Sequence, residues 1–236
     1  FMTVVGVAGC TALIVTGFGL KYSIKTIADK QFNEVFLYDG IAVLNSTDFD
    51  EEQLESKISS IEQVDKFMLT QSVEGIAESG GENQTVSMIV PKTPDSMGDY
   101  INLVSAENGS KLKVKKGSVI ITQKLAKLLD LKTGDTVTVK LNGHEVKSFE
   151  IGGVSKNYAL HYIYITPEDF ESVYGEKPVY NLSFVDLKKD TDENSFKEQL
   201  IANDEFYGIS FKTDSSRGFL NSVDSLDAIV ILLIVC

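Results

Sequence analysis

The two ends of the chain carry no charged side chain. Residues 1–20 read FMTVVGVAGCTALIVTGFGL and residues 228–236 read AIVILLIVC, so every Lys, Arg, Asp and Glu lies between Lys21 and Asp227. A helix of twenty residues rises roughly 30 Å, the hydrocarbon thickness of a bilayer. Glycine and threonine are common in membrane helices, where small residues let helices approach closely. We therefore predict a transmembrane helix at 1–20.

A cleaved signal peptide and a buried core helix are the alternatives for 1–20. A signal peptide ends in a small-residue cleavage site. Here the apolar face instead continues at helical spacing, through Leu20, Ile24 and Ile27. This continuation favours a membrane helix that runs on as a stalk helix over 21–33.

The other apolar end is too short to cross a membrane, because nine helical residues rise roughly 13 Å. We predict that 228–236 begins a second transmembrane helix, cut short in an excerpt of a longer protein. Phe219, Val223 and Leu226 precede it at helical spacing. They predict a stalk helix over 214–227, with Asp214 or Ser215 as its N-cap.

The two stalk helices are expected to pack on each other near the membrane, so cysteines at Ile24 and Val223 should crosslink. The candidate coupling residues share an apolar stalk face; they are Leu20, Ile24, Ile27, Phe219, Val223 and Leu226.

The charged stretch between the ends predicts an α+β domain that divides near 91–118, where Pro, Gly and a basic run interrupt the pattern. We expect a first part over 34–110, a β-rich part over 111–178, and a return to the first part over 179–213. The first part should hold a strand over 34–44, a helix after a capping box at Asp50 and Gln53, a strand over 64–71, and a hairpin of 73–77 with 85–90.

The β-rich part has clearer signals. We predict strands over 117–122, 136–141 and 162–166, a helix capped by Thr122, and a short helix with Pro167 at its first position and Gly175 after its end. Asn142-Gly143 predicts a type I′ hairpin that pairs Val139 with Val146. The apolar positions then change parity, which predicts a bulge near Lys147 or Ser148 and favours a small closed barrel. A strand over 179–185, a helix over 193–201 and a strand over 207–212 are expected to rejoin the first part.

Composition excludes several functions. The formal charge is −12 and the pI is about 4.6, which argues against nucleic-acid binding because phosphate contacts need basic residues. The two cysteines, Cys10 and Cys236, lie in the apolar ends, so the charged domain has no disulfide.

The motifs of common enzymes are missing. The sequence has no P-loop, GxSxG, CxxC or HExxH. We interpret His144 as an exposed turn residue and His161 as a packed or edge-strand residue. The acidic runs 48–52 and 186–193 lack the spacing of a calcium loop. We predict no catalytic, cofactor or metal site, and that the segment is not an enzyme.

Four stretches together resemble the FtsX-like permeases of ABC transporters and their MacB-like periplasmic core domain. They are MTVVGVAGCTALIVTGFGLKYSI (2–24), GSVIITQKLAKLLDLKTGDTVTV (117–139), GGVSKNYALHYIYITPEDF (152–170) and DSLDAIVILLIVC (224–236). The resemblance implies a ferredoxin-like α/β subdomain and a small β-barrel-like subdomain on helical stalks. It also implies a multi-pass protein of the cell membrane whose residues 21–227 are extracytoplasmic.

The resemblance further implies how the protein works. ATP would bind a separate cytosolic ABC ATPase subunit, with no cofactor in this chain. Dimerisation of that subunit would tilt the membrane helices in the lipid bilayer, and the stalk helices would carry the movement to the outer domain, which is termed mechanotransmission. An extracytoplasmic protein, peptide or lipid-like substrate is the expected partner, and nucleic acid is not. A membrane-anchored sensor ectodomain and a membrane-anchored enzyme are the alternatives.

Overall fold

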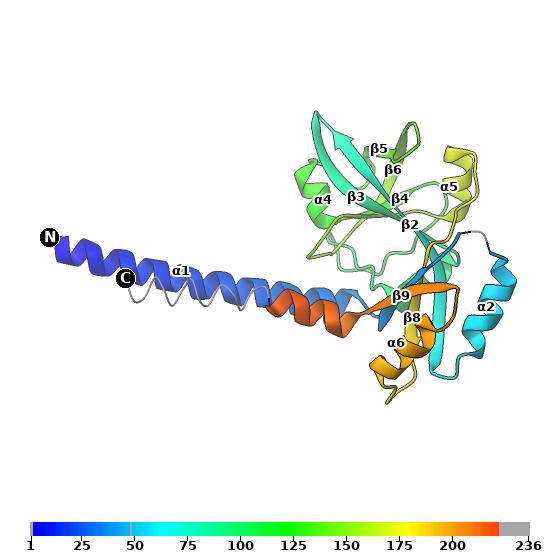
Figure 1. Cartoon of the computed structure of the whole chain (residues 1–236). Coiled ribbons are helices and arrows are strands. Elements are labelled where there is room, and N and C mark those ends of the chain that lie inside the picture. The colour runs from blue at the N-terminus through cyan, green and yellow to red at the C-terminus, as the bar shows by residue number, and fades with distance from the viewer. Residues whose placement is uncertain (1, 48, 222–236) are drawn as a thin grey trace.

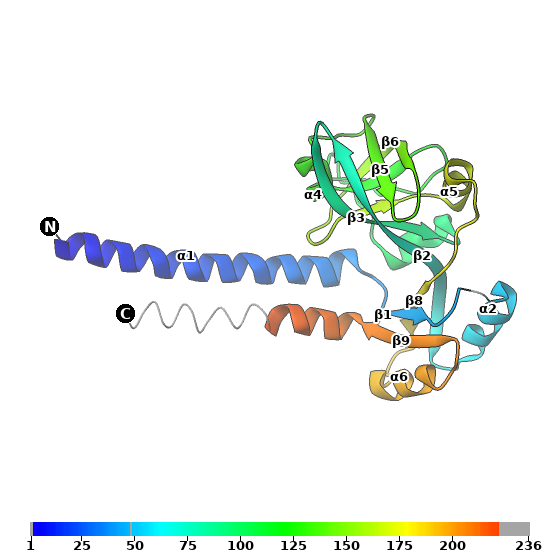
Figure 2. The same ribbon diagram turned by 45° about the horizontal axis from the view of Figure 1, so that its top comes forward.

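The computed structural model describes residues 2–47 and 49–221, which form a long helix and a mixed α+β domain (Figure 1). Helix α1 (Met2–Lys30) projects from the domain and passes into a π-helical turn (Gln31–Val35). A second helix, residues 212–221, leaves the domain in the same direction (Figure 2). The described parts of both helices therefore stand on one side of the domain.

The remaining elements lie within the domain. The strands are β1 (Gly40–Leu44), β2 (Val64–Ser79), β3 (Glu82–Pro91), β4 (Val119–Thr122), β5 (Thr136–Leu141), β6 (Val146–Ser155), β7 (Tyr162–Tyr164), β8 (Leu182–Leu187) and β9 (Phe206–Phe211). The helices are α2 (Glu51–Ser60), a 3-10 turn (Pro94–Ser96) that leads into α3 (Met97–Tyr100), α4 (Gln123–Leu128), α5 (Pro167–Tyr174) and α6 (Glu193–Ile201).

The described strands form one mixed sheet in the order β3-β7-β4-β6-β5-β2-β8-β1-β9. Because β2 also pairs with β3, the strands from β3 to β2 in this order close into a ring. A closed ring leaves no unpaired edge among its members. Gly75 lies where β2 meets β5, and a Cβ there would lie 2.7 Å from the Lys140 carbonyl oxygen. This close approach of two backbones explains the glycine.

The other end of the sheet, β2-β8-β1-β9, is antiparallel. Helix α2 joins β1 to β2 and α6 joins β8 to β9, so the chain follows the β-α-β-β-α-β order of ferredoxin-like folds. Strand β2 belongs to both ends, pairing with β8 through Val64–Thr70 and with β5 through Gly75–Glu78. The division into two subdomains stays a prediction, because this shared strand makes the sheet continuous.

Three clusters of buried side chains make up the core of the described residues. One fills the strand ring and includes Ile121, Val137 and Phe170. A second lies between α2, α6 and the antiparallel strands, with Leu54 and Phe196. The third joins the end of α1 to β2, β3, β4, β7 and β8 and is rich in aromatic rings, among them Tyr38, Tyr100, Tyr164 and Phe184. The end of α1 is therefore part of the hydrophobic core.

Several local predictions are confirmed. Asp50 accepts a hydrogen bond from the Gln53 amide at the start of α2. Thr166 caps α5, which has Pro167 at its first position and ends at Gly175 with φ +78°. Positive φ is unfavourable for residues with a Cβ, so glycine suits this helix end.

Thr122 occupies the N-cap position of α4, as predicted, but the side-chain capping bond expected there is wrong. Thr122 precedes α4, but its hydroxyl accepts a hydrogen bond from the Tyr162 amide instead of one from the helix. The N-caps predicted for the last helix are also wrong, because that helix begins at residue 212 and both Asp214 and Ser215 lie inside it. Thr122 thus uses its oxygen to join two strands.

The hairpin after β5 differs from the prediction. Lys140 pairs with Val146 and Val139 with Lys147, and the pairing of β5 with β6 is regular. The loop therefore has three residues, not two, and only its Gly143 has positive φ. An odd loop length changes the parity of the buried positions, so the bulge predicted at Lys147 or Ser148 is not needed. The register shift of β6 lies further along, opposite Val119.

The strand predicted over 34–44 begins only at Gly40, because helical backbone continues to Val35. The two strands predicted over 64–71 and 73–77 are one strand, β2. The return strands do pair as predicted, β8 with β1 and β2, and β9 with β1.

Candidate functional site

The apolar part of helix α1 is mostly exposed where the structure describes its side chains, within residues 6–20. The stretch Gly6–Val35 is long and apolar enough to cross a membrane, with a mean hydropathy of 1.4 and none of its most apolar window buried. A core helix would be covered by the domain, so that alternative is wrong for this chain. Burial begins near the domain, at Ala28 and Gln31. We call residues 28–37 the N-terminal root.

The N-terminal root holds a polar side chain inside the protein. Gln31 is 1% exposed and Asn157 is 5% exposed. Gln31 Nε2 donates to Asn157 Oδ1 at 2.9 Å, and Gln31 Oε1 accepts from the amides of Tyr158 at 2.8 Å and Ala159 at 3.0 Å. Asn157 Nδ2 in turn donates to the carbonyl oxygens of Ala159 and Leu160. One glutamine thus joins the end of α1 to the segment between β6 and β7.

The geometry of the root explains why Gln31 reaches this segment. The Phe36 amide donates to the Gln31 carbonyl oxygen at 3.0 Å, an i to i−5 bond that widens the last turn. Such π-type turns are rare and occur often at functional sites. Lys30 lies over the ring of Tyr158, with 5.5 Å from Nζ to the ring centroid. The widened turn thus directs consecutive side chains at one segment.

A second set of hydrogen bonds joins the N-terminal root to residues after α3. The Asn102 amide donates to the Val35 carbonyl oxygen, and the Asn102 side chain donates to that of Glu34, both at 2.9 Å. The Leu37 amide donates to the Tyr100 carbonyl oxygen at 2.9 Å. The root is therefore held from two directions.

The second helix is attached differently. Strand β9 passes directly into residues 212–221, and we call residues 210–219 the C-terminal root. The Lys212 amide donates to the Asp39 carbonyl oxygen at 2.8 Å. Lys212 Nζ lies 3.4 Å from the Phe36 carbonyl oxygen. The C-terminal root thus depends on the strand backbone and a half-buried lysine.

The two roots meet at a pair of rings. Phe32 and Phe219 have centroids 6.4 Å apart in an edge-to-face arrangement. Between the roots lies a cavity of about 330 Å³. Its apolar lining comes from both roots, β1 and the β6–β7 segment: Phe32, Phe36, Tyr38, Ile41, Ala159, Leu160, Tyr162 and Phe219. The polar lining residues are Gln31, Ser210, Lys212 and Ser215.

Burial shifts the ionisation of groups around this cavity. It raises the pKa of Tyr162 to about 12 and that of Tyr38 further, so both phenols stay neutral. Burial, with Lys124 nearby, lowers the pKa of His161. His161 Nδ1 is buried without a hydrogen-bond partner. The cavity is thus lined by neutral groups except for Lys212.

The predicted coupling residues are only partly brought together. Leu20 is exposed on α1, while Ile24 and Ile27 are half-buried. Phe219 contacts Phe32, which sequence analysis had not singled out. Val223 and Leu226 lie outside the described residues. Gln31 and Asn157 were also missed, because no local pattern marks a glutamine that will be buried.

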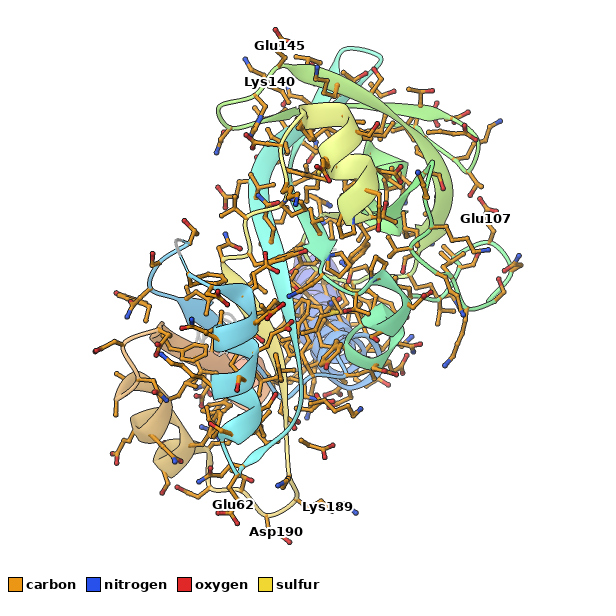
Figure 3. All side chains as sticks on the ribbon, turned by 90° about the vertical axis from the view of Figure 1, so that its right-hand side faces the viewer. Glu62, Glu107, Lys140, Glu145, Lys189 and Asp190 are labelled. Atoms are coloured by element: carbon orange, nitrogen blue, oxygen red, sulfur yellow. The ribbon has the colours of Figure 1, made fainter. Side chains whose placement is uncertain are left out.

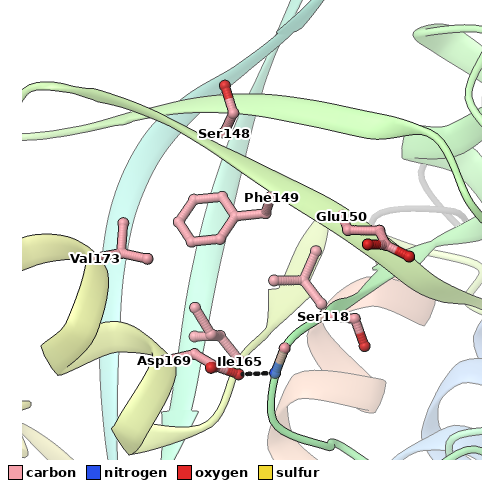
Figure 4. A pocket seen from close by; sticks show the side chains of 9 residues that line it. Ser118, Ser148, Phe149, Glu150, Ile165, Asp169 and Val173 are labelled. Carbon is pink, nitrogen blue, oxygen red and sulfur yellow. Dashed lines mark hydrogen bonds between the residues drawn. The ribbon is translucent and has the colours of Figure 1, made fainter.

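A smaller cavity of about 170 Å³ lies beside α5 (Figure 4). There Asp169 Oδ2 accepts from the Gly117 amide at 2.7 Å and from the Thr166 hydroxyl at 2.9 Å. The carboxylate is thus engaged in holding two loops. The apolar wall of this smaller cavity includes Phe149, Ile165 and Val173.

The histidines differ in their surroundings. His144 was predicted to be exposed, but its side chain is half-buried, with its ring 5.0 Å from that of Tyr174 and Nε2 3.5 Å from Glu176. His161 is half-buried and lies just before β7, which pairs on both sides and is not an edge strand. Within 2–47 and 49–221, no three His, Cys, Asp or Glu side chains gather as a metal site would require.

Comparisons with known proteins found a matching family model and similar solved structures. The model of the family described as MacB-like periplasmic core domain matches residues 2–203. The chain is similar to the periplasmic region of MacB from Actinobacillus actinomycetemcomitans, with 14% identity and a TM-score of 0.48, over 79% of this chain and 94% of that one. It is also similar to the extracellular domain of the noncanonic ABC-type transporter YknZ from Gram-positive bacteria, with 17% identity and a TM-score of 0.48, over 73% and 98%. None of the curated proteins matches the sequence.

Proposed function

The chain belongs to the MacB-like periplasmic core domain family, and from that premise we propose that it transmits movement between the membrane helices of an ABC transporter permease and the domain outside. In this proposal the charge-free part of α1, residues 2–20, lies in the bilayer, and the domain lies on the extracytoplasmic side of a multi-pass protein. ATP binds a separate cytosolic ATPase subunit, and the chain itself is not an enzyme. The expected outer partner is a protein, a peptide or a lipid-like substrate.

The observation that carries the proposal is the Gln31 side chain. A helix that ends in a flexible linker turns freely and moves nothing beyond it. Here the turn that follows α1 is held by three hydrogen bonds between the buried Gln31 side chain and the β6–β7 segment. Buried hydrogen bonds are costly to break without replacement, about 1–3 kcal/mol for each group left unpaired. A tilt of α1 would therefore displace that segment.

The two helices would act on different strands. The N-terminal root contacts the segment between β6 and β7, and both strands belong to the closed ring. The C-terminal root continues β9, at the far end of the sheet. Strand β2 joins the two groups of strands. Relative movement of the helices would thus reach both ends of the domain.

Spin labels test this proposal in the full-length permease, assembled with its ATPase in lipid nanodiscs after replacing the native cysteines. One label replaces Tyr22 on α1, and the other replaces Glu145 or Asp190, which lie at opposite ends of the domain (Figure 3). We expect ATP to change the Tyr22–Glu145 distance, and Gln31→Ala to abolish most of that change.

Gln53→Ala is the matched control, because Gln53 is an exposed glutamine on α2. It should leave the ATP-dependent change intact. An unchanged Tyr22–Glu145 distance in the unmodified protein during ATP turnover would refute the proposal. So would a change of the same size in the Gln31→Ala protein.

A further inference from the structure

We propose that the cavity between the two roots binds the acyl chain of an anionic amphiphile that has left the outer leaflet of the membrane. This inference rests on the proposed function, because it places the site outside the bilayer and beside two moving helices. The cavity volume of about 330 Å³ is at the lower end of the range for small-molecule sites, about 300–1,000 Å³.

The lining selects an apolar ligand. Aromatic rings from both roots and from β7 face the cavity, and Tyr38 and Tyr162 stay un-ionised. The amide nitrogen and oxygen of Gln31 are already hydrogen-bonded to Asn157 and to the amides of Tyr158 and Ala159. A peptide would bring backbone groups that need hydrogen-bond partners. An acyl chain brings none and gains from leaving water.

The mouth of the cavity adds an exposed apolar side chain. Leu160 is 66% exposed and has φ +62°, a conformation that is unfavourable for a residue with a Cβ. Hydrogen bonding of its carbonyl oxygen to Asn157 helps to maintain this backbone. Strained residues are concentrated at ligand sites, where the surroundings hold them in place. The apolar side chain of Leu160 is thus exposed to solvent at the edge of an apolar cavity.

Charge favours an anionic headgroup. Lys212 is the one basic residue among the described residues that line the cavity, in a chain of net charge −12. Its Nζ contacts the carbonyl oxygens of Phe36 and Leu37 at 3.4 and 3.5 Å. Two acidic groups in and beside the C-terminal root have other partners. Asp214 pairs with Arg217, and Glu193 at the start of α6 accepts a hydrogen bond from the Thr213 hydroxyl.

Position argues against a lipid that stays in the bilayer. Phe32 follows the charge-free run by twelve residues, a rise of roughly 18 Å along a helix. The headgroup layer on each side is only about 5–8 Å thick. An acyl chain in this cavity has therefore been lifted out of the membrane.

Tryptophan fluorescence tests the proposal, because the sequence contains no Trp. Leu160→Trp places a single reporter at the mouth of the cavity in the intact chain in nanodiscs. Tyr22→Trp reports from α1, and Tyr207→Trp from the exposed start of β9, with exposures of 74% and 77% for the native residues. The quenchers are free bromoundecanoate and, separately, brominated phosphatidylglycerol in the bilayer.

We expect bromoundecanoate to quench Leu160→Trp saturably, and brominated phosphatidylglycerol to quench Tyr22→Trp but not Leu160→Trp. Ser215→Phe, which fills the cavity, should weaken binding by about tenfold or more, a loss of about 1.4 kcal/mol. Ser216→Phe, on the same helix but outside the lining, should not. Lys212→Gln should weaken binding several-fold.

Equal, unsaturable quenching at Leu160→Trp and Tyr207→Trp would overturn the site, as would unchanged binding in Ser215→Phe. Strong quenching of Leu160→Trp by the bilayer lipid would overturn its placement outside the membrane. The spin-label experiment uses no added amphiphile. If the spin-label experiment succeeds and the fluorescence experiment fails, only the proposed ligand is refuted and the proposed function stands.

Discussion

The two roots support similar helices by different means. The N-terminal root is held largely by side chains, with Gln31 buried against the β6–β7 segment and Asn102 bonded to the carbonyl oxygens of Glu34 and Val35. The C-terminal root is held by its backbone, because β9 runs straight into the helix. One helix is therefore attached to the strand ring and the other to the edge of the antiparallel strands. Under the proposed function, the two helices would therefore act on the domain at two separate places.

The largest effect should come from removing the buried amide. Gln31→Leu leaves Asn157 and the amides of Tyr158 and Ala159 without their partner, at about 1–3 kcal/mol for each buried unpaired group. We expect the unfolding free energy to fall by about 2–4 kcal/mol in denaturant titrations. Lys212→Met at the C-terminal root should cost less than about 1 kcal/mol. Equal losses in the two variants would show that the roots do not differ.

A crosslink should sharpen the comparison by fixing one root to the other. Phe32→Cys with Phe219→Cys, after replacement of Cys10 and Cys236, places thiols where two rings now touch. We expect a short bismaleimide to join them in high yield. The crosslinked protein should keep its fold but lose the ATP-dependent distance change. The pair Phe32→Cys and Tyr207→Cys is the control and should not react.

A smaller effect on the unfolding free energy is expected from pH. It should come from His161, which lies in the segment that contacts the N-terminal root. Burial lowers the folded-state pKa of His161, assisted by Lys124. Below the unfolded value, about 6.5, the unfolded chain binds a proton that the folded chain resists. Stability should therefore be complete above that pH and fall as the pH drops through it. Urea titrations of the unmodified protein and His161→Asn should diverge in this window, and parallel curves would contradict the assignment.

The smallest effect should come from Leu160. Glycine relieves the positive φ but adds freedom to the unfolded chain, and the two terms nearly cancel. We expect Leu160→Gly to change the unfolding free energy by less than about 1 kcal/mol. Leu160→Val should lower it more, because β-branched residues fit positive φ poorly. A larger loss for glycine than for valine would mean that the leucine side chain, not the backbone, holds this loop.

Local signals in the sequence predicted much of the fold. The caps at Asp50 and Thr166 could be predicted because each side-chain oxygen accepts from an amide only three residues further along the chain. A spacing of three residues is visible in the sequence. Thr122 was misjudged because its partner is the amide of Tyr162, forty residues away. The loop at Asn142 was misjudged because two-residue and three-residue hairpins share the same turn residues.

The site was harder to predict than the fold. The apolar spacing of Leu20, Ile24 and Ile27 located the helix but not its attachment. Gln31 bonds to residues 126 to 128 positions away, and nothing in its neighbours specifies burial. Sequence analysis considered only His161 in the segment 157–161. The contacts of this segment with Gln31 are instead made by Asn157 and two backbone amides. Long-range polar contacts leave no periodic pattern, so only the structure locates them.

Hydrogen exchange at single amides tests most directly whether Gln31 attaches α1 to the β6–β7 segment. The experiment compares the intact chain in nanodiscs with its Gln31→Ala variant. We predict that the amides of Tyr158 and Ala159 exchange about tenfold faster or more in the variant, because each loses its acceptor. The Lys212 amide, which donates to Asp39, should be unchanged. Unaltered exchange at Tyr158 and Ala159, or equal acceleration at Lys212, would contradict the account.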